Sequence, residues 1–210
     1  MTATPESRQP PPVQDGKAAE KPAFFLRLLG KVLMRLLGWR TAGVVPQQRK
    51  WVMTGYPHTS NWDFPFFLLI AWSMGFKASW LGKESLFTGP LGWLMRALGG
   101  VPVVRGQGSQ QTEQVAAHFR AVDSLVLAIA PEGTRGPCTG WHTGFYHIAQ
   151  AAGIPIQIGY LDYKNKIGGL GPLLWPSGDI DADLATVAPF LEPFTGKFPQ
   201  NRGPVRVRVK

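Results

Sequence analysis

The sequence predicts an α/β fold: a single domain with a largely parallel mixed sheet flanked by helices, preceded by an N-terminal amphipathic helix. From Lys50 to Leu161, segments typical of strands alternate with segments typical of helices, which is the pattern of parallel strands joined by crossover helices. The chain has 210 residues, which fits one domain with a short appendage. Hydrophobic residues make up 44% and charged residues 17%, which excludes a wholly disordered chain.

The individual elements follow from the hydrophobic pattern. Short apolar runs between Gly, Pro or polar residues indicate strands, and longer runs with helical spacing indicate helices. Strands are expected at 51–56, 78–81, 101–104, 125–130 and 154–161, and helices at 64–74, 91–98, 112–122 and 143–152. After Asp162 the pattern weakens in a Gly- and Pro-rich stretch. There we expect only a helix at 180–191, N-capped by Asp179, and a short strand at 205–209.

The N-terminal region divides into two parts before the folded domain at 42–210. Residues 1–20 contain no aromatic residue and four prolines, and they are predicted to be a disordered tail. Residues 21–41 are predicted to form an amphipathic membrane-interface helix. Arg27, Lys31 and Arg35 are four residues apart and form one basic stripe, whereas the rest of this helix is mostly apolar. The alternative is a helix that packs on the core with its cations in solvent.

The charge of the chain predicts a negatively charged partner. The formal net charge is +9, and the cations concentrate at 21–50 and at 197–210, where there is no acidic residue. A nucleic-acid-binding protein would carry its cations on the folded body, so we expect no nucleic acid as a partner. A non-enzymatic basic module that binds membranes or nucleic acid is the alternative of a different class. The single cysteine excludes an internal disulfide.

A histidine and a carboxylate follow the first expected strand of the domain. His58 and Asp63 stand in the segment HTSNWD, five residues apart, so a turn can bring the carboxylate to the imidazole. Asp63 would then fix the tautomer of the ring and leave the other nitrogen free to take a proton from a hydroxyl. In the alternative interpretation His58 ends a loop and Asp63 caps a helix.

Two further groups of candidate site residues lie where expected strands end. The segment PEGTR, with Glu132, Gly133, Thr134 and Arg135, directly follows the apolar run 125–130. Lys83 and Arg105 also end expected strands. Three cations converging at the same edge of a sheet would form a phosphate-binding site, although each alone is more often solvated.

Several other sites are excluded by spacing. The segment GQGSQQ lacks the third glycine of a dinucleotide fingerprint, and Lys77 stands where a P-loop requires glycine. The segment DIDAD lacks the glycine and the final glutamate of a calcium loop. Cys138, His142 and His147 match no zinc spacing, so no metal is expected. No G-x-S-x-G elbow is present, and the nucleophile is therefore expected to be a hydroxyl of the substrate.

Taken in order, these segments resemble the glycerolipid acyltransferase family, in particular the 1-acylglycerol-3-phosphate (lysophosphatidic acid) acyltransferases. That family has an H-x4-D block, a block that ends in Arg, an E-G-T-R block and a short V/I-P-I block. The corresponding residues here are His58 with Asp63, GGVPVVR ending at Arg105, PEGTR, and GIPI at 153–156, and Lys83 in GKESLF matches a family lysine. The resemblance covers roughly residues 45–160.

The resemblance implies an O-acyltransferase with a glycerol-phosphate acyltransferase-like fold, whose domain spans 42–210. His58 would be the general base and Asp63 its orienting partner. Lys83, Arg105, Glu132, Gly133, Thr134 and Arg135 would bind the substrate. The acyl donor would be acyl-CoA or acyl-ACP, with no other cofactor.

The product expected from 1-acylglycerol-3-phosphate is phosphatidic acid, which belongs to phospholipid biosynthesis. A lyso-ornithine lipid, a glycolipid or another lysophospholipid is the alternative acceptor. The resemblance and the basic helix together imply membrane lipids as partners. They also imply a peripheral or monotopic location on the cytoplasmic face of the inner membrane.

Overall fold

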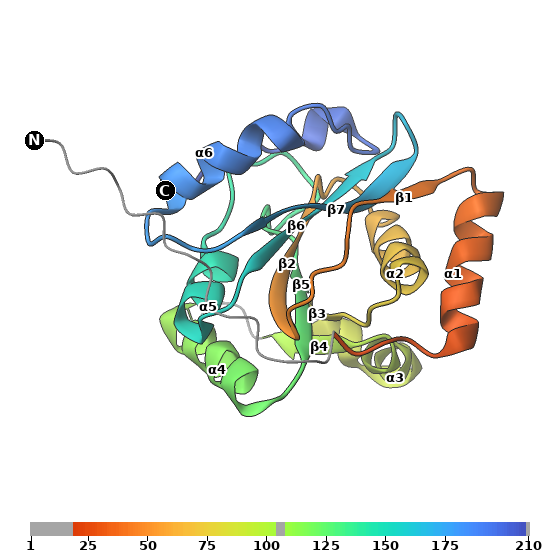
Figure 1. Ribbon diagram of the computed structural model, residues 1–210, viewed down its shortest axis with the longest axis horizontal. Helices are drawn as coiled ribbons and strands as arrows, with labels where there is room; N and C mark the ends of the chain where they lie inside the picture. Colours follow the sequence, from red (N-terminus) through yellow and green to blue (C-terminus); the bar gives the residue numbers. More distant parts are fainter. Residues whose placement is uncertain (1–18, 104–107, 209–210) are drawn as a thin grey trace, which may run out of the picture.

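The computed structural model describes residues 19–103 and 108–208, and it shows a central sheet with helices on both faces (Figure 1). The strands are β1 (Arg40–Ala42), β2 (Lys50–Tyr56), β3 (Ser79–Lys83), β4 (Gly100–Val103), β5 (Leu125–Ile129), β6 (Ile156–Asp162) and β7 (Ile167–Leu174). The α-helices are α1 (Phe24–Leu36), α2 (Asp63–Met74), α3 (Gly89–Ala97), α4 (Gly108–Ala121), α5 (Gly144–Ala152) and α6 (Ile180–Leu191). Two short 3₁₀ helices are η1 (Glu84–Phe87) and η2 (Pro199–Asn201).

The sheet is largely parallel, which confirms the predicted fold class. Its order is β1-β7-β6-β2-β5-β3-β4, and every pair from β6 to β4 is parallel. The strand β7 is antiparallel to β6, and β1 is parallel to β7. Since β2 lies between β5 and β6, the loops after β2, β5 and β6 leave the same edge of the sheet. Ligands of open α/β sheets bind at such an edge.

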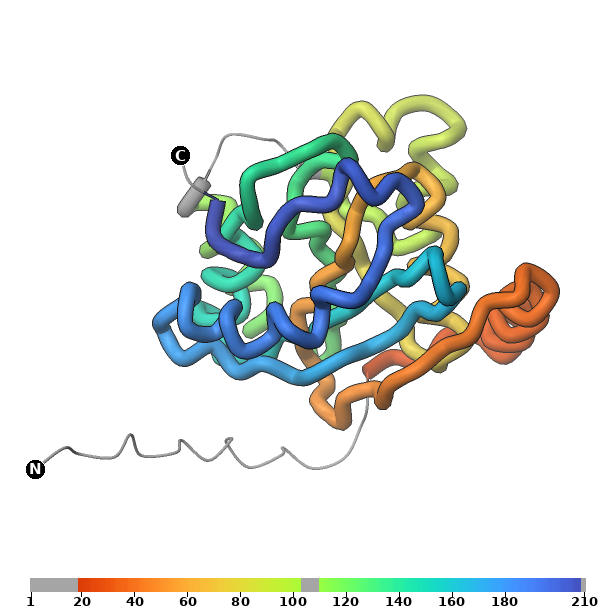
Figure 2. The backbone as a smooth tube through the Cα atoms, turned by 90° about the horizontal axis from the view of Figure 1, so that it is seen from above, coloured from red at the N-terminus to blue at the C-terminus, as the bar shows by residue number. Residues whose placement is uncertain are grey.

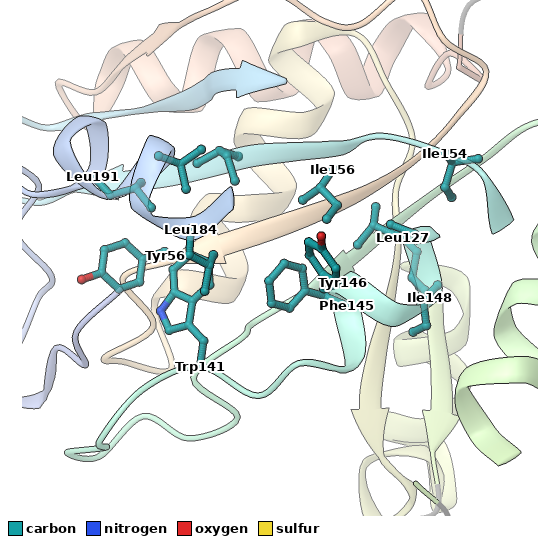
Figure 3. Packing of buried hydrophobic residues seen from close by; sticks show 14 of the residues in the cluster. Tyr56, Leu127, Trp141, Phe145, Tyr146, Ile148, Ile154, Ile156, Leu184 and Leu191 are labelled. Carbon is teal, nitrogen blue, oxygen red and sulfur yellow. The ribbon is translucent and has the colours of Figure 1, made fainter. Parts of the chain in front are cut away.

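The side chains of β2 alternate between two hydrophobic clusters. Val52 and Tyr56 face a cluster that is completed by α4, α5 and α6, and Figure 3 shows Tyr56 beside Trp141 in this cluster. Trp51 and Met53 face a second cluster, which includes residues of α2 and β3. Both faces of β2 are therefore buried, as expected for the central strand of a parallel sheet.

The helix α1 lies outside this core and packs on α2, at the periphery of the molecule (Figure 2). The contact is closest at Gly30, where an added Cβ would lie 2.9 Å from the backbone nitrogen of Ser73 and 3.0 Å from the carbonyl oxygen of Leu69. Gly30 and Met34 are buried, one turn apart. A glycine is required here because the backbones of the two helices touch.

Three strands differ from the sequence prediction. The strands β1 and β7 were not predicted, because β1 has only three residues and β7 contains IGGLGPLL, whose glycines and proline suggest a loop. Backbone approach explains one of these glycines, since a Cβ at Gly169 would lie 1.9 Å from the carbonyl oxygen of Ala42. The strand predicted at 205–209 is wrong for its described residues, where Val207 makes only an isolated bridge to Trp141.

The predicted disordered tail falls mostly outside the described residues, which begin at Ala19. Ala19 itself is buried, and the backbone nitrogen of Lys77 donates to the carbonyl oxygen of Glu20. The two last residues of the predicted tail therefore belong to the folded body. At the other end of the chain, the N-cap prediction is confirmed, because the Asp179 carboxylate accepts from the backbone nitrogen of Ala182 at 3.0 Å.

Replacing Gly30 with alanine should destabilise the protein by about 1–3 kcal/mol, because the new methyl group overlaps the backbone of α2. Alanine normally stabilises a helix relative to glycine by about 0.5–1 kcal/mol. Gly144→Ala is the matched control, since a Cβ at Gly144 meets nothing within 4 Å. Urea unfolding measures both variants, and a Gly30→Ala protein more stable than the wild type would contradict the close contact.

Candidate active site

The predicted His58–Asp63 pair forms at the end of β2. The chain leaves β2 at Tyr56, passes a cis peptide bond to Pro57, and forms a short loop before α2 begins at Asp63. His58 Nδ1 lies 3.2 Å from Asp63 Oδ2, and the His58 side chain is 20% exposed. A ring nitrogen that donates to a carboxylate leaves the other nitrogen as an acceptor. His58 Nε2 can therefore receive a proton from a bound molecule.

Asp63 is held by four donors from two directions. Its Oδ2 atom also accepts from the backbone nitrogens of Thr59, at 2.7 Å, and Ser60, at 2.8 Å. Its Oδ1 atom accepts from the hydroxyl group of Tyr163 at 2.7 Å. The carboxylate is only 4% exposed and lies in the first turn of α2, where the helix dipole favours a negative charge. These contacts fix the orientation of the carboxylate toward His58.

Tyr163 follows β6 and was not among the predicted site residues. Burial, followed by the hydrogen bond to Asp63, raises the pKa of Tyr163 far above its ordinary value. The hydroxyl group therefore stays protonated and remains a donor to Asp63. Its place one residue after the carboxyl end of a strand was the available sequence signal, but no short motif marks it.

Glu132 is buried against the backbone of the His58 loop rather than exposed to solvent. Its Oε2 atom accepts from the backbone nitrogen of His58 at 2.5 Å, and its Oε1 atom accepts from the backbone nitrogen of Gly203 at 3.0 Å. The side chain is 1% exposed. Burial raises the pKa of Glu132, and the two backbone donors oppose that rise. The resemblance implied substrate binding for Glu132, but both carboxylate oxygens contact the protein itself.

A C-terminal segment, residues 194–203, also contacts this loop and the end of β2. The backbone nitrogen of Phe198 donates to Thr59 Oγ1 at 3.3 Å, and Tyr56 donates from its hydroxyl group to the carbonyl oxygen of Gly203 at 2.8 Å. A Cβ at Gly196 would lie 2.6 Å from Thr59 Oγ1. This contact could not be predicted from the sequence, because it joins residues far apart in the chain.

The last three residues of the PEGTR segment, 133–135, are exposed. Gly133 has a φ angle of +66°, and its backbone nitrogen donates to the carbonyl oxygen of Ala130 at 3.1 Å, so the chain turns sharply after β5. A Cβ at Gly133 would lie 2.7 Å from the ring of His142, so the turn accepts no side chain without movement. Thr134 and Arg135 are exposed at this turn.

The last two of the predicted substrate-binding residues are the cations Lys83 and Arg105. Lys83 is the last residue of β3 and is exposed, at the same sheet edge as His58 and Arg135. Arg105 lies outside the described residues, two positions after Val103, which pairs with Lys83. The structure thus brings His58, Asp63 and Glu132 into contact and leaves Lys83 and Arg135 as exposed cations at that edge.

Replacing Glu132 with glutamine should destabilise the protein by about 1–3 kcal/mol, because the amide NH2 would face a buried backbone N–H group and leave it without an acceptor. Glu113→Gln, on the surface of α4, is the control and should change the unfolding free energy by less than about 0.5 kcal/mol. Urea unfolding at neutral pH compares the two. Equal stability of the two variants would show that the Glu132 bridge contributes nothing.

The fold resembles that of one solved enzyme. The crystal structure of the 1-acyl-sn-glycerophosphate (LPA) acyltransferase PlsC from Thermotoga maritima matches with a TM-score of 0.57 and 17% sequence identity. The match covers 80% of this chain and 76% of that chain. None of the curated proteins has a significant match to the sequence.

The family model described as Acyltransferase matches residues 40–157, which is more than half of the chain. The matched range includes the loop with His58 and Asp63 and the PEGTR turn, which the structure brings together at one sheet edge. The chain therefore belongs to the acyltransferase family.

Proposed function

We propose that the protein transfers a fatty acyl group from an acyl thioester, acyl-CoA or acyl-ACP, to the hydroxyl group of 1-acylglycerol-3-phosphate, giving phosphatidic acid. The observation that carries this proposal is the His58–Asp63 contact of 3.2 Å at the carboxyl end of β2. The family supplies the reaction type. The fold shared with the Thermotoga maritima enzyme, which is an LPA acyltransferase, suggests the acceptor.

The reaction begins with a proton transfer to His58. Nε2 takes the proton of the acceptor hydroxyl group while Nδ1–H donates to Asp63, which stabilises the resulting imidazolium. The acceptor oxygen forms a bond to the thioester carbonyl carbon, and the tetrahedral intermediate then expels the thiolate. The imidazolium returns its proton to the thiolate, so His58 is neutral again. Tyr163 and the backbone nitrogens of Thr59 and Ser60 keep Asp63 in place throughout.

Glu132 acts as a positioning residue in this scheme. Its carboxylate accepts from the backbone nitrogen of His58 itself, so it fixes the main chain that carries the imidazole. The PEGTR turn supplies Arg135 and exposed backbone at Gly133 and Thr134, close to where an oxyanion would form. We assign Arg135, Lys83 and Arg105 to the acceptor phosphate, because Lys83 ends β3, Arg135 lies in the turn after β5, and the sequence places Arg105 two positions after β4.

We propose that α1 docks the enzyme peripherally on the membrane that holds its lysolipid, on the cytoplasmic face where acyl thioesters are made. Phe24 is 82%, Phe25 65% and Leu36 75% exposed, on the side of α1 that faces away from α2. No helix in the described ranges is both long enough and apolar enough to cross a bilayer. An interfacial helix buries such an apolar face among the lipid headgroups.

His58→Ala should lower turnover about 10²–10⁴-fold, because the proton of the acceptor hydroxyl group loses its base. Thiol release from acyl-CoA in detergent measures the turnover. His118→Ala, on the exposed surface of α4, is the matched control, and near wild-type turnover of the His58→Ala protein would overturn the mechanism.

Arg135→Ala should raise the KM for 1-acylglycerol-3-phosphate by about 10–100-fold, since a charge-assisted hydrogen bond is worth about 1.5–3 kcal/mol. The KM for the donor should change less than about threefold if the phosphate is the ligand of Arg135. Lys164→Ala, an exposed cation in the β6–β7 turn, is the control. If the wild-type protein turned over lyso-ornithine lipid or another lysophospholipid as fast as 1-acylglycerol-3-phosphate, those acceptors would be favoured instead.

A further inference from the structure

A second cationic site lies far from the PEGTR turn, at the C-terminal end of α1. A groove of about 450 Å³ opens between α1 and the start of β1, and we call it the basic groove. Lys31 and Arg35 of α1 and Arg40 of β1 supply its cations, and Met34, Trp39 and Ser73 are among its other lining residues. Its volume lies within the range of roughly 300–1,000 Å³ that is usual for small-molecule sites.

The basic groove combines buried apolar residues with exposed cations. Met34 is 3% and Trp39 6% exposed, whereas Lys31, Arg35 and Arg40 are all exposed. A fourth cation stands beside it, because Lys166 Nζ is 3.4 Å from the carbonyl oxygen of Leu37 and a Cβ at Gly38 would lie 3.6 Å from Nζ.

No acidic side chain offsets this charge from the same part of the chain. Residues 21–62 contain no Asp or Glu, and none lines the basic groove. Arg35 lies in the last turn of α1, where the helix dipole favours a cation. That explanation does not extend to Arg40 or Lys166, which belong to other elements. Like charges held together without a counterion favour an anionic ligand.

The exposed apolar surface of α1 lies next to this groove. With 100° between successive residues, Leu28, Val32 and Leu36 point away from the buried Gly30–Met34 side. Arg35 lies at the border of this apolar surface. Arg27 lies closer to α2, since a Cβ at Gly75 would be 3.5 Å from Arg27 Cζ. The groove cations and the apolar face therefore form one continuous surface, with charge beside hydrocarbon.

We propose that the basic groove binds the headgroup phosphate of an anionic phospholipid in the membrane on which α1 docks. The phosphate lies among Lys31, Arg35 and Arg40, while the acyl chains of that lipid lie along the apolar face of α1. This lipid is a membrane anchor and not the acyl acceptor, whose phosphate we assign to other residues. The proposal rests on the membrane docking of α1.

One lining residue of the groove, Trp39, also contacts Tyr163, which donates to Asp63 of the catalytic pair. Trp39 lines the groove and packs edge-on against Tyr163 with ring centroids 5.0 Å apart, and Tyr163 donates to Asp63. The Trp39 side chain would thus lie between a headgroup bound in the groove and Tyr163, whose hydroxyl group donates to Asp63. The enzyme would be oriented on the surface rather than merely attracted to it.

Vesicle co-sedimentation of the full chain tests this proposal. The vesicles are phosphatidylcholine alone or with about a fifth phosphatidylglycerol, at physiological salt. The groove variant is Arg35→Gln with Arg40→Gln, and the matched control is Lys21→Gln with Arg27→Gln, which removes the same charge from the same basic region. Leu28→Asp reports on the apolar face, and activity in detergent shows that each variant folds.

We expect the groove variant to lose about 30-fold in partitioning onto the anionic vesicles, at about 1 kcal/mol per cation, and the control variant less than about threefold. Both should match the wild type on neutral vesicles, and Leu28→Asp should reduce binding to both vesicle types. Equal losses by the groove and control variants would overturn the groove and leave the docking of α1 intact. A wild-type protein that binds neither vesicle would overturn both, without bearing on the acyl-transfer chemistry measured in detergent.

Discussion

The site depends on one buried carboxylate. Glu132 accepts backbone hydrogen bonds from His58 in the β2 loop and from Gly203 near the C-terminus, and it belongs itself to the turn after β5. Three segments that are distant in the sequence are thereby held at one point beneath the imidazole. Placing an ionised group there is costly, and the two N–H donors compensate for its lost hydration. Preorganisation of His58 is the consequence, because its main chain is fixed before any substrate binds.

The central position of β2 makes this arrangement possible. Thr54 of β2 pairs with Ile129 of β5, so the His58 loop and the PEGTR turn leave the sheet side by side. On its other side β2 pairs with β6, which delivers Tyr163 to Asp63. Parallel register therefore brings together His58 and Asp63, which follow β2, Tyr163, which follows β6, and Glu132, which follows β5. The helices on both faces of the sheet contribute hydrophobic packing.

The first helix links an exposed apolar surface to the region of the His58–Asp63 pair. Gly30 lets α1 rest directly on the backbone of α2, the helix that begins at Asp63. Trp39 stacks on Phe66 of α2 and also contacts Tyr163. The same helix leaves large apolar side chains exposed, which a helix with only a packing role would bury. Aromatic packing of Trp39 and Tyr163 therefore connects the segment after α1 to Asp63.

The sequence by itself determined the local features, and tertiary structure decided the rest. The strands and helices from Lys50 to Ala152, the His58–Asp63 contact and the Asp179 cap could be predicted, because each depends on patterns within a few residues. The strand β7 could not, because its glycines are explained only by close approach to β1 and to other neighbours. The partners of Glu132 and the contact of Tyr163 with Asp63, 100 residues away, likewise follow from strand order. Hydrophobic periodicity encodes which face of an element is buried, whereas only the assembled sheet determines which loops meet at its edge.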